Sequence, residues 1–146
     1  MQESGGVKSF TGKFRWLSNF YPAQVRGVGN FDYPTVEHAY QAAKTTDEHQ
    51  WVWFASLAMC PRPGDAKRRG QKLILRRDWD AIKLPVMEAL LRQKFARGSE
   101  LAAKLAEIDG EIVEGNYWGD TFWGQCGGLG FNHLGRMLMK IRDELR

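Results

Sequence analysis

The chain has 146 residues, 43% hydrophobic and 26% charged, which fits one globular domain and excludes two catalytic domains. Its formal net charge of +4 and isoelectric point near 9.2 favour a phosphate-bearing partner, although ordinary soluble domains carry similar charges. No apolar stretch approaches the roughly 20 residues that cross a bilayer, and residues 1–6 do not resemble a secretory signal, so we expect a cytoplasmic protein with no membrane partner.

The N-terminal part of the chain predicts short strands and then a helix. Residues 10–33 contain several glycines between short aromatic or β-branched runs, which is typical of two or three short strands. Such runs occur at 14–17 and 24–26. Thr35 is a favourable N-cap for a helix over residues 36–44, which contain neither glycine nor proline.

The next three helices are predicted from capping residues, proline and periodicity. Asp47 can cap a helix that runs to residue 59 and ends before Pro61, and a short basic helix begins at Asp65. Apolar residues recur at steps of three and four over 78–97, so this segment is the longest predicted helix. Pro85 lies inside it and marks either its start or a kink.

The last third of the chain predicts two helices around an irregular segment. Ser99 caps a helix through about residue 107, and residues 111–114 are a strand candidate. A loop rich in glycine and aromatic residues then leads to a final helix capped by Asn132. The predicted fold is therefore one α+β domain, mostly helical.

Three polar residues of the predicted helix at 36–44 share one face. Glu37, Gln41 and Lys44 are spaced i, i+4 and i+7, and Tyr40 borders them. Such a stripe is usually solvated, and composition alone favours this structural alternative. Beside aromatic walls, however, a buried carboxylate has a raised pKa and can move protons or stabilise a cation.

The aromatic loop contains a second carboxylate. Asp120 lies between Trp118 and Trp123 in a chain with six Trp and 16 Gly, and planar bases stack on such rings at about 1 to 3 kcal/mol each. A pocket wall is one interpretation. The alternative is a buried aromatic turn in which Asp120 accepts backbone hydrogen bonds, and the spacing leaves the two even.

Two further signals are weaker. The glycines at 127–130 precede a helix and could cradle phosphate, but the lysine and hydroxyl of a P-loop are missing. Residues 67–77 form a basic cluster, for which a solvated helix face is the favoured interpretation. The two cysteines and three histidines lack ligand spacing, so we expect neither a metal nor a cofactor. Hydrolysis through carboxylates is the chemistry that remains.

Several segments between residues 10 and 142 occur in a characteristic order. They are FRWLSNFYP at 14–22, YPTVEHAYQAAK at 33–44, DWD at 78–80, M-x6-K-F at 87–95, VEGN at 113–116, WG at 123–124 and NHLGRMLM at 132–139. Together they resemble the NADAR family of YbiA-like N-glycosidases. The resemblance implies a single domain over residues 1–146, with a small β-sheet formed largely by N-terminal strands.

The resemblance also implies an activity and a set of site residues. It implies hydrolysis of the N-glycosidic bond between a ribose and a base-like amine, as in ADP-ribosylated guanine of nucleic acid or a phosphoribosylaminopyrimidine of riboflavin biosynthesis. Glu37 and Asp120 match the catalytic positions. The expected substrate-binding residues are Asn19, Tyr40, Lys44, Trp79, Trp123 and Asn132. Many relatives have basic residues where this chain has Leu129 and Phe131, so no phosphate grip is expected there.

Cleavage of a C1′–N bond places positive charge on the ribose and negative charge on the departing base. We expect Glu37 to activate water or orient ribose hydroxyls, Asp120 to lie near C1′, and Trp79 or Trp123 to stack on the base; the choice of general base stays open. One alternative is a noncatalytic module that binds ADP-ribose or NAD. Another is a basic nucleic-acid-binding domain without a pocket. The oligomeric state is open.

Overall fold

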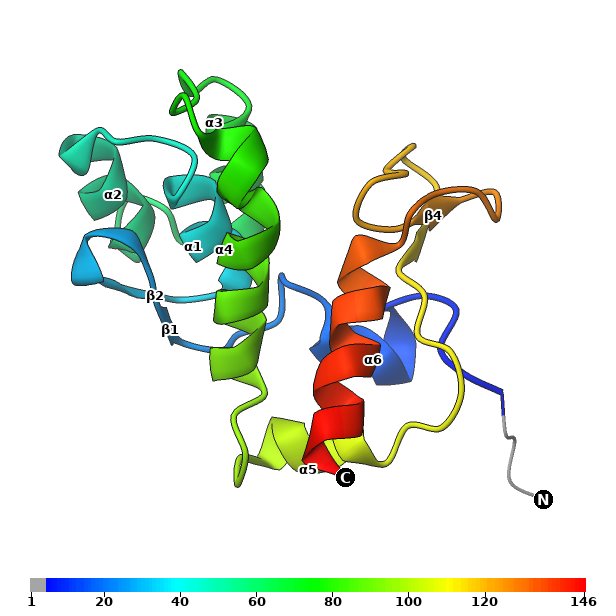
Figure 1. The fold of residues 1–146 in the computed structure, drawn as a ribbon. Helices are drawn as coiled ribbons and strands as arrows, with labels where there is room; N and C mark the ends of the chain where they lie inside the picture. Colours follow the sequence, from blue (N-terminus) through cyan, green and yellow to red (C-terminus); the bar gives the residue numbers. More distant parts are fainter. Residues whose placement is uncertain (1–4) are drawn as a thin grey trace. The chain divides into compact units, whose positions relative to one another are not determined.

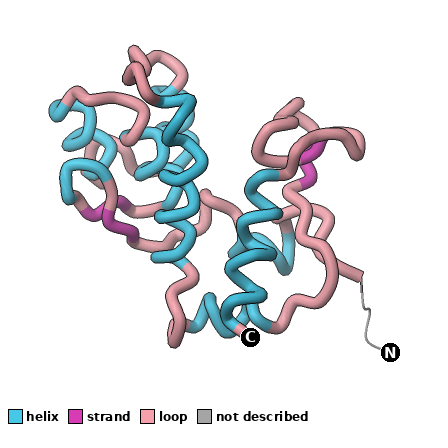
Figure 2. Tube along the Cα trace, viewed as in Figure 1, coloured by secondary structure: helices cyan, strands magenta, loops and turns pink. Residues whose placement is uncertain are grey.

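The computed structural model describes residues 5–146, so residues 1–4 of the predicted domain lie outside the described part (Figure 1). Helices dominate it, and its strands are two residues long (Figure 2). The elements in chain order are η1 Gly12–Leu17, β1 Val25–Arg26, η2 Val28–Asn30, β2 Asp32–Tyr33, α1 Val36–Ala42, α2 Glu48–Ala55, α3 Pro63–Gly70, α4 Trp79–Lys94, α5 Glu100–Ala106, β3 Gly115–Asn116, β4 Gln125–Cys126 and α6 His133–Leu145.

The chain forms two units. The α1 unit is Asn19–Lys94, and the α6 unit contains the residues up to Ser18 together with Phe95–Arg146. Among the described residues, no helix is long and apolar enough to span a membrane.

Helix α1 is the centre of the α1 unit. It packs against α2, α3 and α4, and all seven of its residues are buried. Thr35 caps it as predicted, because its side-chain oxygen accepts the backbone N–H of His38 at 3.1 Å. The helix prediction is confirmed. The solvated-stripe alternative is wrong, since Glu37 and Gln41 are buried with the apolar residues.

The other helices of the α1 unit differ from their predictions mainly at their ends. Asp47 caps α2 by accepting the N–H of His49, but the helix ends at Ala55 instead of residue 59. Helix α3 begins at Pro63, because proline has a helical φ and needs no donor at the first position. Helix α4 runs from Trp79 to Lys94 and is the longest helix of the described residues, as predicted, although it ends before residue 97. Its proline lies inside it, so the alternative of a start near Pro85 is wrong.

Strands β1 and β2 form the N-terminal sheet. They pair antiparallel, with Val25 opposite Tyr33, and both of these side chains are buried. The strand predicted at 24–26 is confirmed. The one at 14–17 is wrong: this segment belongs to the 3-10 helix η1, which buries Trp16 edge-on against Phe95 with ring centroids 6.2 Å apart.

The α6 unit packs α5 against α6 and carries the second sheet. Ser99 caps α5 by accepting the N–H of Ala102, as predicted. Residues 111–114 are not a strand, since Ile112 makes only an isolated bridge with Val7. Instead, β3 and β4 pair in parallel within the glycine-rich segment. The mostly helical α+β class with a small N-terminal sheet is confirmed.

Candidate functional site

The centre of the candidate site is a buried carboxylate on α1. Glu37 is 8% exposed and Gln41, one turn later, is 5% exposed. The side-chain amide of Gln41 donates from Nε2 to Glu37 Oε2 at 2.6 Å. The backbone N–H of Glu37 donates to the carbonyl oxygen of Asn19 at 3.1 Å. A hydrogen bond to an ionised acceptor is roughly twice as strong as a neutral one, so this contact fixes the carboxylate.

Lys44 interacts electrostatically with this carboxylate and with two further lysines. Burial lowers the pKa of Lys44, the charge of Glu37 raises it, and the charges of Lys67 and Lys83 lower it further. Lys44 follows directly after α1, Lys67 lies on α3 and Lys83 on α4. The charge of one carboxylate and of two further cations therefore acts on Lys44, and this excess of positive charge suits an anionic ligand.

Two aromatic side chains pack against each other where α1 meets α4. Tyr40 and Trp79 pack with ring centroids 5.2 Å apart at 56°, and both are buried. The ammonium group of Lys44 lies 5.5 Å from the centroid of Tyr40. The α1 unit thus contains Asn19, Glu37 and these three residues, all five of its predicted site positions. Trp79 is only 5% exposed, so its ring faces Tyr40 rather than open solvent.

Gln41 was expected on the face of Glu37, whereas the influence of Lys67 and Lys83 on Lys44 was not predicted. The i, i+4 spacing signalled Gln41, whereas the lysines of α3 and α4 approach through packing that no local pattern encodes. Arg69, in the same basic cluster, has other partners. Arg69 stacks on Trp53, with its guanidinium 4.0 Å from the ring centroid, and donates to Gln50.

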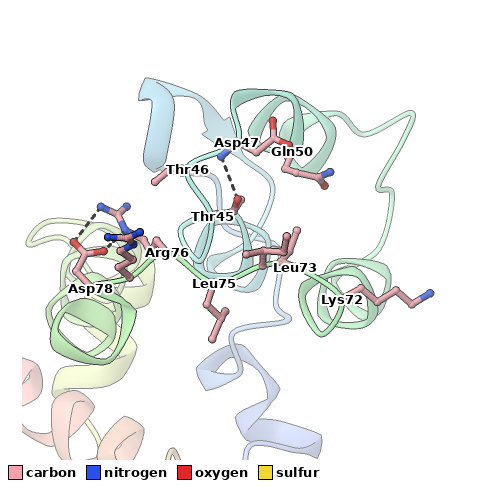
Figure 3. A pocket seen from close by; sticks show the side chains of 11 residues that line it. Thr45, Thr46, Asp47, Gln50, Lys72, Leu73, Leu75, Arg76 and Asp78 are labelled. Carbon is pink, nitrogen blue, oxygen red and sulfur yellow. Dashed lines mark hydrogen bonds and ion pairs between the residues drawn. The ribbon is translucent and has the colours of Figure 1, made fainter.

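An open groove of about 760 Å³ follows directly after Lys44 in the α1 unit. Residues 45–47 and Gln50 form one side, and residues 72–78 form the other. Figure 3 shows Arg76 and Asp78 at one end and Lys72 at the other. The groove is joined to α1, because the backbone N–H of Arg76 donates to the carbonyl oxygen of Lys44 at 2.8 Å.

In the α6 unit, Asp120 organises the aromatic loop. Its Oδ1 accepts the backbone N–H groups of Phe122 at 3.1 Å and Trp123 at 2.9 Å. Asn116 accepts the N–H of Asp120 and donates to its carbonyl oxygen. These hydrogen bonds agree with the interpretation of this segment as a turn in which Asp120 accepts backbone N–H groups. Trp118 nevertheless keeps 52% of its surface exposed, so the loop also presents a ring to solvent.

Asn132 precedes α6, but its side chain makes no capping hydrogen bond, so the predicted cap is wrong. Its Nδ2 donates to the carbonyl oxygen of Ile112 at 2.9 Å, and its Oδ1 accepts the N–H of Glu114 at 3.0 Å. A cap is unnecessary, because the backbone N–H groups of residues 131–134 donate to carbonyl oxygens of residues 121–124. These bonds occupy the N–H groups at the start of α6, on which the phosphate-cradle interpretation partly depended.

The histidines and cysteines do not form a metal centre in the described residues, where no three potential ligands gather. His38 is fully buried and hydrogen-bonded. Its ring nitrogens contact Thr35 Oγ1 at 2.8 Å and the carbonyl oxygen of Cys60 at 3.0 Å. Burial lowers the pKa of His38, which favours its neutral form.

Comparison with known proteins places these features in a family. Residues 8–146 match the NADAR domain. The chain is 33% identical over 134 residues to an N-glycosidase of Nostoc punctiforme, covering 89% of this chain and 85% of that protein. It is 37% identical over 135 residues to the N-glycosidase YbiA of Escherichia coli, covering 88% of this chain and 80% of that protein.

Two further similarities concern the fold and a longer protein. The NMR structure of E. coli YbiA matches with a TM-score of 0.80 and 33% identity, covering 99% of this chain and 86% of that one. A riboflavin biosynthesis protein of Vibrio vulnificus is 36% identical over 136 residues, which is 90% of this chain but 35% of that protein.

Proposed function

Because the chain belongs to the NADAR domain family, we propose that it is a hydrolase that cleaves the N-glycosidic bond between a ribose and a base-like amine. The observation that carries this proposal in the structure is the buried pair of Glu37 and Gln41, with Lys44 interacting with Glu37 and with two further lysines. A buried carboxylate can stabilise positive charge on a ribose, and the lysines can bind the phosphate of the same substrate.

The proposed reaction adds water across the C1′–N bond. The bond breaks with its electron pair on nitrogen, the ribose becomes cation-like, and water attacks C1′. Glu37 stabilises this cation or takes the proton of the attacking water, and that proton leaves with the amine. Lys44 binds substrate phosphate, and the packed rings of Tyr40 and Trp79 form an apolar wall beside α1.

Asp120 is proposed as the second carboxylate. Its Oδ1 is held by two backbone N–H groups, which gives the carboxylate one orientation. The neighbouring rings of Trp118 and Trp123 support stacking of a base on this loop. Asn132 holds the segment before this loop, because its Oδ1 accepts the N–H of Glu114, and its backbone N–H donates to the carbonyl oxygen of Gly124 in the loop. Its proposed contribution to substrate binding is to fix the loop in this way.

Two substrate classes fit this reaction: ADP-ribosylated guanine in nucleic acid, and a phosphoribosylaminopyrimidine. The α1 unit contains twelve Lys and Arg against eight Asp and Glu, so the whole net charge of +4 resides in it. This charge, with exposed Lys72 and Arg77 at the groove, supports a nucleic-acid substrate. The riboflavin-related relative supports the pyrimidine.

The deciding experiment offers the purified protein an ADP-ribosylated guanine oligonucleotide, a phosphoribosylaminopyrimidine and NAD, and follows the products by mass spectrometry. We expect release of base or ribose product from one of the first two. Glu37→Gln should slow this about 100-fold or more. Glu48→Gln is the matched control, because Glu48 also lies in the first turn of a helix but is exposed.

The noncatalytic alternative makes the opposite prediction. A module that only binds ADP-ribose or NAD releases no product from any substrate, and calorimetry would detect binding that Glu37→Gln leaves nearly unchanged. Asp120→Asn is measured in parallel. Product formation at the wild-type rate in both carboxylate variants would reject the proposed site while leaving the activity in place.

A further inference from the structure

Both polar atoms of the Gln41 side-chain amide are held in place. Its Nε2 donates to Glu37 Oε2 at 2.6 Å. Its Oε1 lies against the Cα of Gly70, the last residue of α3, and a Cβ at that position would overlap Oε1. Gly70 is buried in the packing of α1 against α3. A larger residue at this position would therefore have to displace the Gln41 amide.

This packing decides which way the amide points. In the described residues, Gln41 Oε1 has no hydrogen-bond partner and contacts the weakly polar Cα–H of Gly70. If the amide turned over, two acceptor oxygens would face each other at Glu37, and the NH₂ donors would face a methylene group. An unpaired buried donor costs about 1 to 3 kcal/mol, so the observed orientation is strongly preferred.

We propose that Gln41, locked in one orientation by Gly70, is a positioning residue that fixes the side-chain rotation of Glu37 and keeps its carboxylate ionised for the reaction. This inference rests on the proposed function, because it assigns to Glu37 the part described there. Gly70 acts indirectly, through Gln41, and does not contact substrate.

Lys44 also acts on Glu37, and its contribution must be separated from that of Gln41. The ammonium group of Lys44, just after α1, favours an ionised carboxylate, while Lys67 on α3 and Lys83 on α4 act on Lys44. Gln41→Met keeps a side chain of similar length and leaves the three lysines in place. Any change in the titration of Glu37 in this variant therefore reports the lost amide donor.

The first test measures the pH profile of kcat/KM in Gln41→Met and Gly70→Ala. We expect the acidic limb to move to higher pH by about one unit in both variants, with kcat reduced more than KM is raised. Gly64→Ala is the matched control, since it makes the same change in the same helix. A Cβ at Gly64 would meet only Arg68 Nη1, at 3.7 Å, and its profile should not move.

The second test asks whether Gly70 acts through Gln41. Gln41→Ala leaves space for a Cβ at position 70, so adding Gly70→Ala to it should produce no further shift of the acidic limb. Additive shifts would overturn the locking step. Unchanged profiles in Gln41→Met, with only thermal stability reduced, would overturn the positioning role.

A third measurement is independent of activity. The side-chain carboxyl ¹³C signal of Glu37, followed against pH by NMR, should titrate at higher pH in Gln41→Met and Gly70→Ala than in the wild type or Gly64→Ala. If the wild type cleaves no substrate, the proposed function fails, while this titration still decides whether Gln41 sets the charge of Glu37. An unchanged titration in a folded Gln41→Met variant would reject the inference.

Discussion

The ammonium group of Lys94 lies over the ring of Tyr21, 5.8 Å from its centroid, although Lys94 is only 4% exposed. Burial lowers the pKa of Lys94 from its ordinary 10.5 to about 7. Between these two values the unfolded chain binds more protons than the folded one, so the free energy of unfolding rises with pH.

Because of Lys94, we expect the free energy of unfolding to increase by at most about 2 kcal/mol between about pH 7 and about pH 9. Urea denaturation at several pH values measures it. In Lys94→Met the rise should vanish and the stability at neutral pH should increase, because no ammonium group is buried. The same slope in wild type and variant would contradict the assignment.

Lys44 should give the enzyme an alkaline limit. Burial lowers its pKa below the ordinary value of 10.5, so its ammonium group is lost at a lower pH than that of an exposed lysine. We expect KM for a phosphate-bearing substrate to rise through that range. Lys44→Arg, which stays charged, should remove the alkaline rise in KM. Lys44→Met should raise KM about tenfold or more at neutral pH.

Asn132 should matter for stability more than a typical loop asparagine. Asn132→Ala leaves the carbonyl oxygen of Ile112 and the N–H of Glu114 without their partner, which we expect to cost about 2 to 4 kcal/mol in a urea titration. Asn30→Ala is the control, because Asn30 also has a positive φ, of 63°, but is exposed. Equal losses in both variants would mean that backbone strain, and not the two hydrogen bonds, dominates.

The groove should distinguish polymeric from small substrates. Lys72→Ala/Arg77→Ala removes two exposed cations beside the groove, so we expect kcat/KM for a modified oligonucleotide to decrease and to depend less on salt. The value for the corresponding free nucleotide should stay the same. Lys13→Ala/Arg15→Ala, which removes two exposed cations from η1, is the control. Equal effects on both substrates would exclude the groove as a strand-binding surface.

The sequence predicts some of these features and not others, for physical reasons. The caps at Thr35, Asp47 and Ser99 were predictable because each bonds a backbone N–H two or three residues later. Asn132 looks the same locally, yet its side chain bonds residues about twenty positions away. Residues 14–17 are predicted as a strand because aromatic residues are frequent in sheets. They form part of the 3-10 helix η1 instead, because β-propensity depends on how neighbouring side chains pack.

Only part of the candidate site can be predicted from the sequence. Glu37 was named from a family resemblance, while its pattern alone favoured solvent exposure. Its burial arises because three other helices cover α1, which is a tertiary property. No local sequence pattern points to Gly70, because its small size matters only for its contact with one side-chain atom of a residue in another helix.

The complete burial of α1 has a consequence for how the protein opens. A helix of seven residues is too short to persist in water by itself, so α1 exists only while α2, α3 and α4 enclose it. Its amide hydrogens should therefore exchange with solvent only when the whole α1 unit unfolds, and not through local fraying. The geometry around Glu37 would then be lost in one cooperative step, which leaves no partly unfolded form with a working carboxylate.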